Sequence, residues 1–345
     1  MSNYPNIVFF FADDQRFDTV AALGNREIKT PNLDRLVESG TAFTHAHIPC
    51  GTSGAVCMPS RAMLHTGRTL LHLDRVGQSI PVDHIMLGEV LKKNGYRTFG
   101  TGKWHNGTES YARSFTDGAE IFFGGMQDHW NVPAHNFDPT GEYSSRTLKV
   151  NNCMHDNLES EFISDHVVAG KHSSELFCEA TADFIDQYEN STPFFTYTSL
   201  MAPHDPRSMP KEFRDMYNPS ELPLPENFMA LHPVEYGNTD CRDELLAPYP
   251  RTPDVVRRHL ADYYGMISHL DHQMGLVIEA LERKGVLENT LILFAGDNGL
   301  ALGQHGLFGK QSTYEHSVRV PFIISGPGVP VGEKRDAYIY LLDIY

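Results

Sequence analysis

The chain has 345 residues, 41% of them hydrophobic and 21% charged, and its formal net charge at pH 7 is −16. This length and apolar content predict one large α/β domain or two smaller ones with a substantial buried core. The negative charge argues against a general nucleic-acid binder, whose phosphate contacts need a dense basic surface. Any anionic substrate must therefore be bound by a local group of cations.

The five cysteines are too few and too scattered for a disulfide framework, and the absence of a Cys-x-x-Cys pair argues against structural zinc. A single bridge between Cys50 and Cys57 is conceivable. No stretch approaches the ~20 apolar residues of a membrane span, and the N-terminus lacks the apolar run of an export signal. We therefore expect a soluble chain. The native compartment is not predicted, because exported proteins lose their leader.

The first predicted strand is the continuous apolar run over residues 6–12, which ends abruptly at Asp13 and Asp14. A run of this kind is typical of a central parallel strand that is covered on both faces. Open α/β sheets bind their ligands at the carboxyl ends of such strands, so the two carboxylates indicate a site. The alternative is a solvated acidic turn. A short helix is predicted to begin at Thr30-Pro31 and to stop at Gly40.

The stretch from Cys57 to Arg68 resembles a nucleophile site in its local chemistry. Pro59 fits the first turn of a helix, which places Cys57 just ahead of the helix N-terminus. That end of a helix carries free backbone donors and a partial positive charge, which favour a thiolate or a bound anion. Arg61, about one turn later, should lie close to the same face. The alternative is a buried structural cysteine before an ordinary helix.

A helix over about 84–94 and a strand over 96–100 are predicted next, and the chain then delivers Lys103 and His105 to the same edge of the sheet. The alternative for each is surface decoration. Residues 106–171 show no sustained period, and we expect them to shape a pocket.

A helix over about 173–188 and a strand over 194–200 follow, and His204 lies just beyond that strand. The Pro-rich segment 207–253 is too long for a bare connection, so we interpret it as a pocket wall. The longest helical pattern covers residues 254–284 and closes at Gly285. Its two histidines, His269 and His272, are expected to be structural.

The last predicted strand, over 291–295, ends at Asp297 and Asn298. Strands that alternate with helices and carry polar residues at their carboxyl ends predict a layered α/β sheet with one active edge. Together with Asp13 and Asp14, these residues make an all-oxygen set that suits Ca²⁺ or Mg²⁺ and is poor for Zn²⁺.

The string Cys57-Met58-Pro59-Ser60-Arg61, with the following Leu64, Thr66, Gly67 and Arg68, resembles the signature of the type I sulfatases of the alkaline phosphatase superfamily. In that family a formylglycine-generating enzyme oxidises the cysteine to an aldehyde, which is the nucleophile once hydrated. The resemblance implies an alkaline-phosphatase-like α/β/α domain with a central, mostly parallel sheet over residues 1–345. It also implies a sulfated carbohydrate or other sulfate ester as the substrate.

The resemblance extends to a divalent cation site and to the residues around the sulfate. It implies that one cation, usually calcium, is bound by Asp13, Asp14, Asp297, Asn298 and the modified Cys57. The segment from Gly303 to Lys310 also resembles the family, in which it carries a sulfate-binding lysine; Lys310 is that candidate.

The implied catalytic roles follow the charge that develops on the sulfuryl group. Arg61 would act with the cation to polarise the attacking hydroxyl, and Lys103, His204 and Lys310 would neutralise the transferring group. By resemblance, His105 assists breakdown of the sulfo-enzyme ester and His204 donates a proton to the leaving oxygen. A further histidine, His305, is about equally consistent with substrate contact and with a structural role.

Full-length sulfatases continue past the segment 338–345 into a small C-terminal subdomain, which we expect to be missing from this chain. The segments 201–206 and 303–306 resemble those of bacterial carbohydrate sulfatases, which favours a sugar O-sulfate. Two alternatives stay open. One is a phosphonate monoester or phosphodiester hydrolase of the same superfamily. The other is a lectin-like protein that binds sulfated glycans with Cys57 unmodified.

Overall fold

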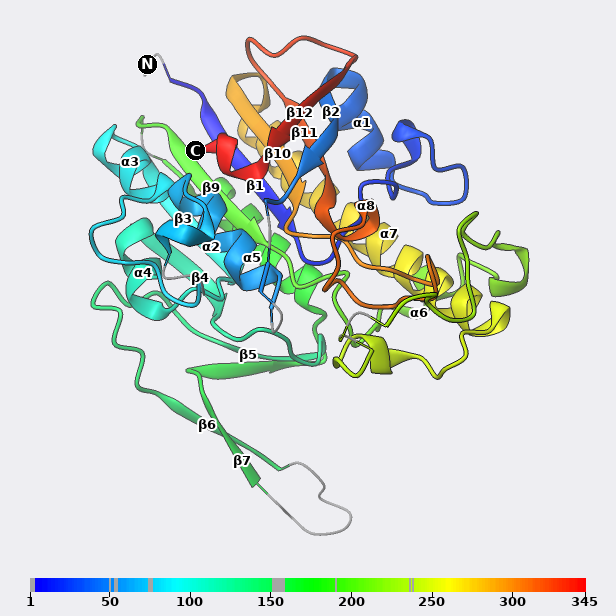
Figure 1. Ribbon diagram of the computed structural model, residues 1–345. Helices are drawn as coiled ribbons and strands as arrows, with labels where there is room; N and C mark the ends of the chain where they lie inside the picture. The colour runs from blue at the N-terminus through cyan, green and yellow to red at the C-terminus, as the bar shows by residue number, and fades with distance from the viewer. Residues whose placement is uncertain are drawn as a thin grey trace.

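The central feature of the computed structural model is an eight-stranded sheet with helices on both faces (Figure 1). The structure describes residues 4–345 except 50, 53–54, 74–76, 151–158, 190, 236 and 238. The strand order is β12-β2-β11-β10-β1-β9-β3-β4. These strands are β1 (Asn6–Ala12), β2 (Gly40–His47), β3 (Arg97–Lys103), β4 (Asp117–Phe122), β9 (Phe194–Ser199), β10 (Thr290–Gly296), β11 (Arg319–Ser325) and β12 (Glu333–Tyr340).

Within this sheet β11 runs antiparallel to both of its neighbours, and the other seven strands run parallel to one another. Helices α1 (Pro31–Ser39), α5 (Ser173–Gln187) and α7 (Pro253–Lys284) cover one face, and α2 (Cys57–Thr66), α3 (Leu87–Lys93) and α4 (Thr108–Ser114) cover the other. The predicted layered α/β/α architecture with a mostly parallel sheet is thus confirmed.

Strand β1 shows why its sequence is apolar without interruption. Val8 and Phe10 point into the core beneath α1, α5 and α7, whereas Phe9 and Phe11 point into the core on the α2 side. Both faces of the strand are therefore removed from water, and alternation with polar residues would leave unpaired polar groups in one of the two cores.

Helix α1 stops at Gly40 as predicted, and that residue also begins β2, a strand that was not predicted. Gly40 has an extended backbone, with φ −145°, and a Cβ atom there would lie 2.1 Å from the carbonyl oxygen of Ile324. The glycine is therefore needed for the close approach of β2 to β11 and not for a left-handed helix cap.

Other element boundaries shift by a few residues. Cys57 is the first residue of α2 and not the residue before it, and the helix predicted over 84–94 is shortened to α3. Strand β3 continues to Lys103, so the lysine ends the strand and does not follow it.

Two segments that the sequence left without predicted elements contain short ones. The 106–171 segment contains α4, β4, β5 (Asn131–Ala134), β6 (Arg146–Val150), β7 (Glu159–Ile163) and β8 (His166–Ala169). The pairs β5–β8 and β6–β7 each form a two-stranded sheet, and the β6–β7 ribbon projects from the body (Figure 1). The 207–253 segment is irregular apart from α6 (Lys211–Arg214) and single turns.

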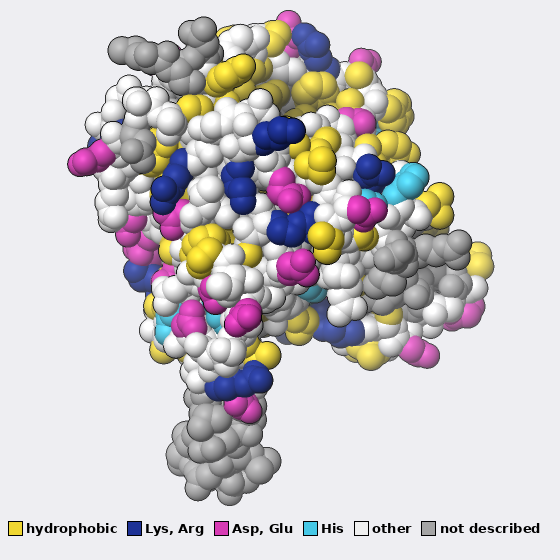
Figure 2. All heavy atoms as spheres, turned by 90° about the vertical axis from the view of Figure 1, so that its left-hand side faces the viewer, with side chains coloured by type: hydrophobic (Ala, Val, Ile, Leu, Met, Phe, Trp, Pro, Cys, Tyr) yellow, Lys and Arg dark blue, Asp and Glu magenta, His cyan; other side chains and the backbone are white. Residues whose placement is uncertain are grey.

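The remaining helical elements are short. They are α8 (Glu315–Val318) and the 3₁₀ turns Ala21–Leu23, Leu70–His72, Pro219–Glu221, Glu244–Leu246, Leu287–Asn289 and Leu341–Ile344. Among the helices that the structure describes, none is both long and apolar enough to cross a bilayer. On the side of the molecule that bears α3 and α4, Lys and Arg side chains lie interspersed with Asp and Glu side chains (Figure 2).

Candidate active site

The polar side chains that follow four neighbouring strands meet at one edge of the sheet. Asp13 and Asp14 follow β1, Lys103 ends β3, His204 lies beyond β9, and Asp297 follows β10. All five are buried, with at most 6% of the residue surface exposed. Because these strands are parallel, their carboxyl ends lie at the same edge, as the sequence predicted.

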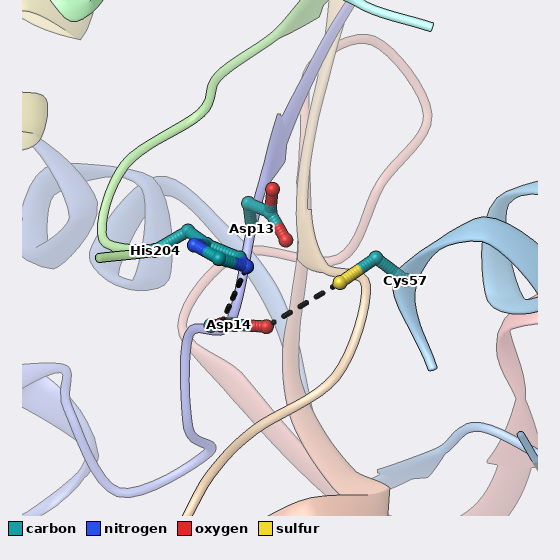
Figure 3. Close-up of side chains that lie close together, drawn as sticks. All are labelled: Asp13, Asp14, Cys57 and His204. Carbon is teal, nitrogen blue, oxygen red and sulfur yellow. Dashed lines mark hydrogen bonds and ion pairs between the residues drawn. The ribbon is translucent and has the colours of Figure 1, made fainter. Parts of the chain in front are cut away.

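Cys57 reaches this edge from the opposite direction, as the first residue of α2 (Figure 3). Its thiol donates to Asp14 Oδ1 at 3.6 Å and accepts a hydrogen bond from Lys310 Nζ at 2.9 Å. The same ammonium group donates to Asp14 Oδ1 at 2.7 Å. Cys57 carries a free thiol in the structure, and Cys50, its conceivable bridge partner, lies outside the described residues.

Arg61 is fully buried one turn further along α2. Its Nε donates to Asp297 Oδ2 at 2.9 Å, and its Nη1 donates to the carbonyl oxygen of Lys103 at 2.9 Å and to Ser199 Oγ at 2.5 Å. Cys57 and Arg61 are both residues of α2 and lie one turn apart, so they share a face of that helix as predicted. Ser199, the last residue of β9, was missed by the sequence analysis because a serine within a predicted strand carries no signal of its own.

The remaining contacts of the carboxylates connect residues at the ends of different strands. Lys103 Nζ donates to Asp13 Oδ2, and the backbone N–H of Asp14 donates to Asp297 Oδ1 at 2.9 Å. The Asn298 amide donates to Asp14 Oδ1 at 2.6 Å. The site therefore alternates buried cations and buried anions, the arrangement in which charged groups tolerate removal from water.

The predicted histidines occupy different positions. His204 lies with its Nε2 3.7 Å from Asp14 Oδ2 (Figure 3), and its backbone carbonyl interacts with His129 Nε2 at 3.0 Å. His105 lies just beyond Lys103, and burial, with the charge of Lys103, lowers its pKa to about 2. His305 stacks on Tyr314 with ring centroids 4.3 Å apart, outside the group of charged side chains.

Electrostatic coupling shifts the pKa values of the two clustered aspartates in opposite directions. Burial alone would raise the pKa of Asp13, but Lys103, His204, Arg61 and Lys310 together outweigh it and hold that pKa well below its usual value. Burial, with the negative charge of Asp13 next in importance, raises the pKa of Asp297 to about 7.

Burial and the charge of Asp13 also raise the pKa of the Cys57 thiol well above its usual value, although Lys310 opposes them. The predicted preference of the helix N-terminus for a thiolate is therefore outweighed here by burial and by the surrounding carboxylates.

The residues present suit a hard cation. Ligand atoms of Asp13, Asp14, Cys57 and His204 all lie within 4.8 Å of one another. Among the described side chains, Asp13 Oδ1 and Asn298 Oδ1 are buried oxygens with no hydrogen-bond partner. Buried acceptors are normally satisfied, so two unpaired oxygens beside two carboxylates fit a divalent cation that prefers oxygen. The structure adds His204 to this group, whereas Asp297 joins it through hydrogen bonds.

A buried ion pair from the 207–253 segment holds the loop that carries Lys310. The Glu244 carboxylate accepts the backbone N–H groups of Phe308 at 2.9 Å and Gly309 at 2.7 Å, and Arg251 Nη2 at 2.5 Å. Arg251 Nε also donates to the Gly306 carbonyl at 3.1 Å. The sequence analysis predicted a pocket wall here but did not identify these two residues, because an acid and a base in an irregular segment have no diagnostic spacing.

A cavity of about 280 Å³ adjoins the charged group, and its lining includes Thr52, Val56, Lys310 and Gln311. A larger cavity of about 1000 Å³ lies beside Arg16, His305 and Tyr314. Of the charged site residues, Lys310 alone is among the residues that line either of these two cavities.

Comparison with known proteins gives a consistent result. The family model described as Sulfatase matches residues 5–345. An arylsulfatase of Clostridium perfringens (strain 13 / Type A) is 30% identical over 99% of this chain and 72% of its own length. An ulvan-active sulfatase of Formosa agariphila is 28% identical over 94% of this chain and 57% of its own length.

A solved structure shows the same architecture. The crystal structure of Ps i-CgsB in complex with k-i-k-neocarrahexaose superposes with a TM-score of 0.70, at 26% sequence identity, over 99% of this chain and 70% of that one. The chain thus spans between roughly half and three quarters of the length of the proteins it matches.

Proposed function

The chain belongs to the sulfatase family, with its alkaline-phosphatase-like fold, and on that premise we propose that it hydrolyses the O-sulfate ester of a carbohydrate. The observation that carries the proposal is the position of Cys57 at the start of α2, with its sulfur 2.9 Å from Lys310 Nζ and beside Asp14. A nucleophile at this point faces a buried cation that can bind an anionic ester.

The nucleophile in this proposal is formylglycine, made from Cys57 by a formylglycine-generating enzyme that reads the Cys57–Arg61 motif. We also propose that Asp13, Asp14, Asp297, Asn298 and the modified Cys57 hold one Ca²⁺, with Mg²⁺ as the alternative. When present, the ion and the hydrated aldehyde supply a polarised hydroxyl for attack on sulfur and a second hydroxyl whose deprotonation releases sulfate.

The chain's own cations then bind and orient the ester. Lys310, which already lies between Cys57 and Asp14, and Lys103, which is paired with Asp13, neutralise charge on the sulfuryl oxygens. Arg61 orients Asp297 and the end of β3 through its three hydrogen bonds. This division leaves the arginine in place as support while the lysines contact the substrate.

Two histidines assist the reaction in the proposal. His204, at the rim of the charged group, donates to the leaving oxygen. With its pKa lowered to about 2, His105 is neutral at pH 7, and in the proposal its uncharged imidazole assists release of the enzyme-bound sulfate through a hydrogen bond.

The carbohydrate assignment is supported by the relatives and by the pocket. One relative is named for its activity on ulvan, and one solved neighbour is described with a neocarrahexaose bound. The cavity of about 280 Å³ beside Lys310 is close to the lower end of small-ligand pockets and suits a sulfate with part of one sugar ring.

The proposal is tested on protein co-produced with a formylglycine-generating enzyme. Peptide mass spectrometry across Cys57 should show the aldehyde, and an aryl sulfate should be hydrolysed. Chelation should abolish turnover, and Ca²⁺ should restore it. Cys57→Ala should be inactive, whereas Cys178→Ala, at a buried free cysteine in the apolar core, serves as the matched control.

Two outcomes would replace the proposal. An aldehyde with turnover of an aryl phosphonate and none of an aryl sulfate would assign the chain to the phosphonate and phosphodiester hydrolases. A thiol that stays unmodified beside the maturation enzyme, in a protein that binds sulfated glycan without turnover, would assign it as a binding protein.

A further inference from the structure

Asp14 has an unusual backbone conformation for a residue at the centre of a site. Its φ is 67°, in the left-handed region that a residue with a side chain rarely occupies, and the residue is 3% exposed. This conformation turns the chain sharply after β1 and directs the Asp14 carboxylate toward Cys57 and Lys310. A conformation of this kind persists where surrounding contacts hold it.

The hydroxyl group of Tyr263 provides such a contact. It donates to the carbonyl oxygen of Asp14 at 2.6 Å and accepts the backbone N–H of Arg16 at 2.9 Å. One oxygen atom therefore joins the two peptide groups on either side of the turn, and both its donor and an acceptor position are used.

The ring of Tyr263 is itself rigidly placed. It lies in the interior of α7, is fully buried, and carries the guanidinium groups of Arg16 and Arg207 at 6.0 and 5.9 Å from its centroid. On the other side of the turn, the N–H of Asp14 donates to Asp297 Oδ1. The Asp14 residue is thus held at its N–H by another site residue and at its carbonyl by α7.

We propose that Tyr263 is a positioning residue that sets the orientation of the Asp14 carboxylate for cation binding. The inference rests on the cation site of the proposed function and extends it to a residue on the helix behind the sheet. Removing the hydroxyl leaves the Asp14 carbonyl and the Arg16 N–H without their partner. The turn then relaxes away from the conformation in which Asp14 faces Asp13 and Asn298.

The neighbouring Tyr264 offers a matched control. It is the next residue of α7 and is also buried, at 8% exposure, but its hydroxyl accepts from Asn25 Nδ2 at 3.2 Å, away from the site. Tyr263→Phe and Tyr264→Phe therefore remove the same atom from adjacent residues of one helix. Only the first substitution removes a contact to Asp14.

The test is a calcium titration of the thermal unfolding midpoint, made on the chain with Cys57 as a thiol, so that catalytic activity is not needed. Tyr263→Phe should raise about tenfold the Ca²⁺ concentration needed for a given upward shift of the midpoint, the scale expected for one lost buried hydrogen bond. Tyr264→Phe should change it less than about twofold. A purely structural role would lower the midpoint equally with and without Ca²⁺ and leave the titration unshifted.

The outcomes separate this inference from the proposed function. A parent chain that neither Ca²⁺ nor Mg²⁺ stabilises would overturn the cation part of the proposed function, and this inference with it. If Ca²⁺ stabilises the parent chain and the Ca²⁺ titration of Tyr263→Phe is the same as that of the parent chain, this inference alone would be overturned. As a second readout, Tyr263→Phe converted to the aldehyde should recover part of its lost aryl-sulfate turnover when Ca²⁺ is raised tenfold.

Discussion

Two cations reach the buried carboxylates of the site from structurally different elements, Arg61 pairing with Asp297 and Lys310 with Asp14. Arg61 projects from α2, whereas Lys310 stands on the irregular loop that follows β10. The position of Arg61 is determined by the regular backbone of a helix packed on the sheet. Its three acceptors are Asp297, the Lys103 carbonyl and Ser199.

The loop that carries Lys310 is held by residues outside the sheet. The loop before Lys310 has its N–H groups at Phe308 and Gly309 bound by Glu244, and Glu244 is in turn paired with Arg251. Both supporting residues belong to the irregular 207–253 segment. The helix backbone alone therefore places Arg61, whereas Lys310, on a loop, depends on a dedicated buried polar contact.

The largest expected effect tests the loop side. Glu244→Gln should lower the free energy of unfolding by about 3–5 kcal/mol, because Arg251 is then left buried without its anion. Urea unfolding measures this loss, and the KM for an aryl sulfate should rise as Lys310 is displaced. Glu244→Asp, which keeps the negative charge, should restore part of the free energy of unfolding and part of the KM.

The matched control for that substitution is Glu282→Gln, which breaks the half-exposed ion pair with Arg35. Exposed pairs of this kind contribute less than about 1 kcal/mol. Equal losses of unfolding free energy in Glu244→Gln and Glu282→Gln would mean that the loop does not depend on the buried ion pair. The contrast between the Arg61 helix and the Lys310 loop would then fail.

The next effect tests the helix side. Arg61→Lys keeps the positive charge but cannot reproduce the fork that reaches Asp297, the Lys103 carbonyl and Ser199. We expect kcat/KM for an aryl sulfate to fall by about 10²-fold, the scale of a small misplacement of catalytic groups, because Asp297 and the end of β3 lose the donors that orient them. Arg68→Lys, at an exposed position just beyond α2, should leave kcat/KM within about twofold. A similar loss of kcat/KM in Arg61→Lys and Arg68→Lys would contradict this interpretation.

The smallest effect concerns the turn that carries His204. His129 contacts the His204 carbonyl and stacks on His172 with ring centroids 5.0 Å apart, and His172 packs against His269 at 4.5 Å. Burial, followed by the charge of His129, lowers the pKa of His172 to about 2. His269, which the sequence analysis expected to be structural, thus takes part in a buried stack behind the site.

This lowered pKa makes stability depend on pH in a defined direction. Below pH ~6.5 the unfolded chain protonates at His172 while the folded chain does not, so stability is full above that pH and declines as the pH falls toward 2. When the pH is lowered from 7 to 5.5, the free energy of unfolding measured in urea should fall by about 1 kcal/mol less for His172→Gln than for the parent chain. His72→Gln, at an exposed site, is the control; identical pH slopes for the parent chain and His172→Gln would contradict the prediction.

Some of the site could be predicted from sequence because its signals are local. The apolar run of β1 followed by Asp13 and Asp14, and the Cys57–Arg61 string, each lie within a few consecutive residues. The helical period of α7 is equally local, and it ends where Gly285 takes the left-handed conformation with φ 71°. Parallel strands then bring their carboxyl ends to one edge without further information.

Other parts were decided by contacts between residues distant in sequence. Strand β2 was missed because its polar and small residues become a strand only when paired with β11 and β12, and those two strands lie almost 300 residues later. The same reason applies to Glu244, whose acceptor role depends on a loop 64 residues away.

The family motif, the layered α/β/α class and the charged residues at the strand ends follow from short stretches of sequence. How those charges are held depends on contacts that form only in the folded chain. Tyr263 and Tyr264 are adjacent and chemically identical, yet only Tyr263 reaches Asp14, 249 positions away along the chain. Hydrogen bonds across such separations have no local pattern, because they exist only once packing has brought the two segments together.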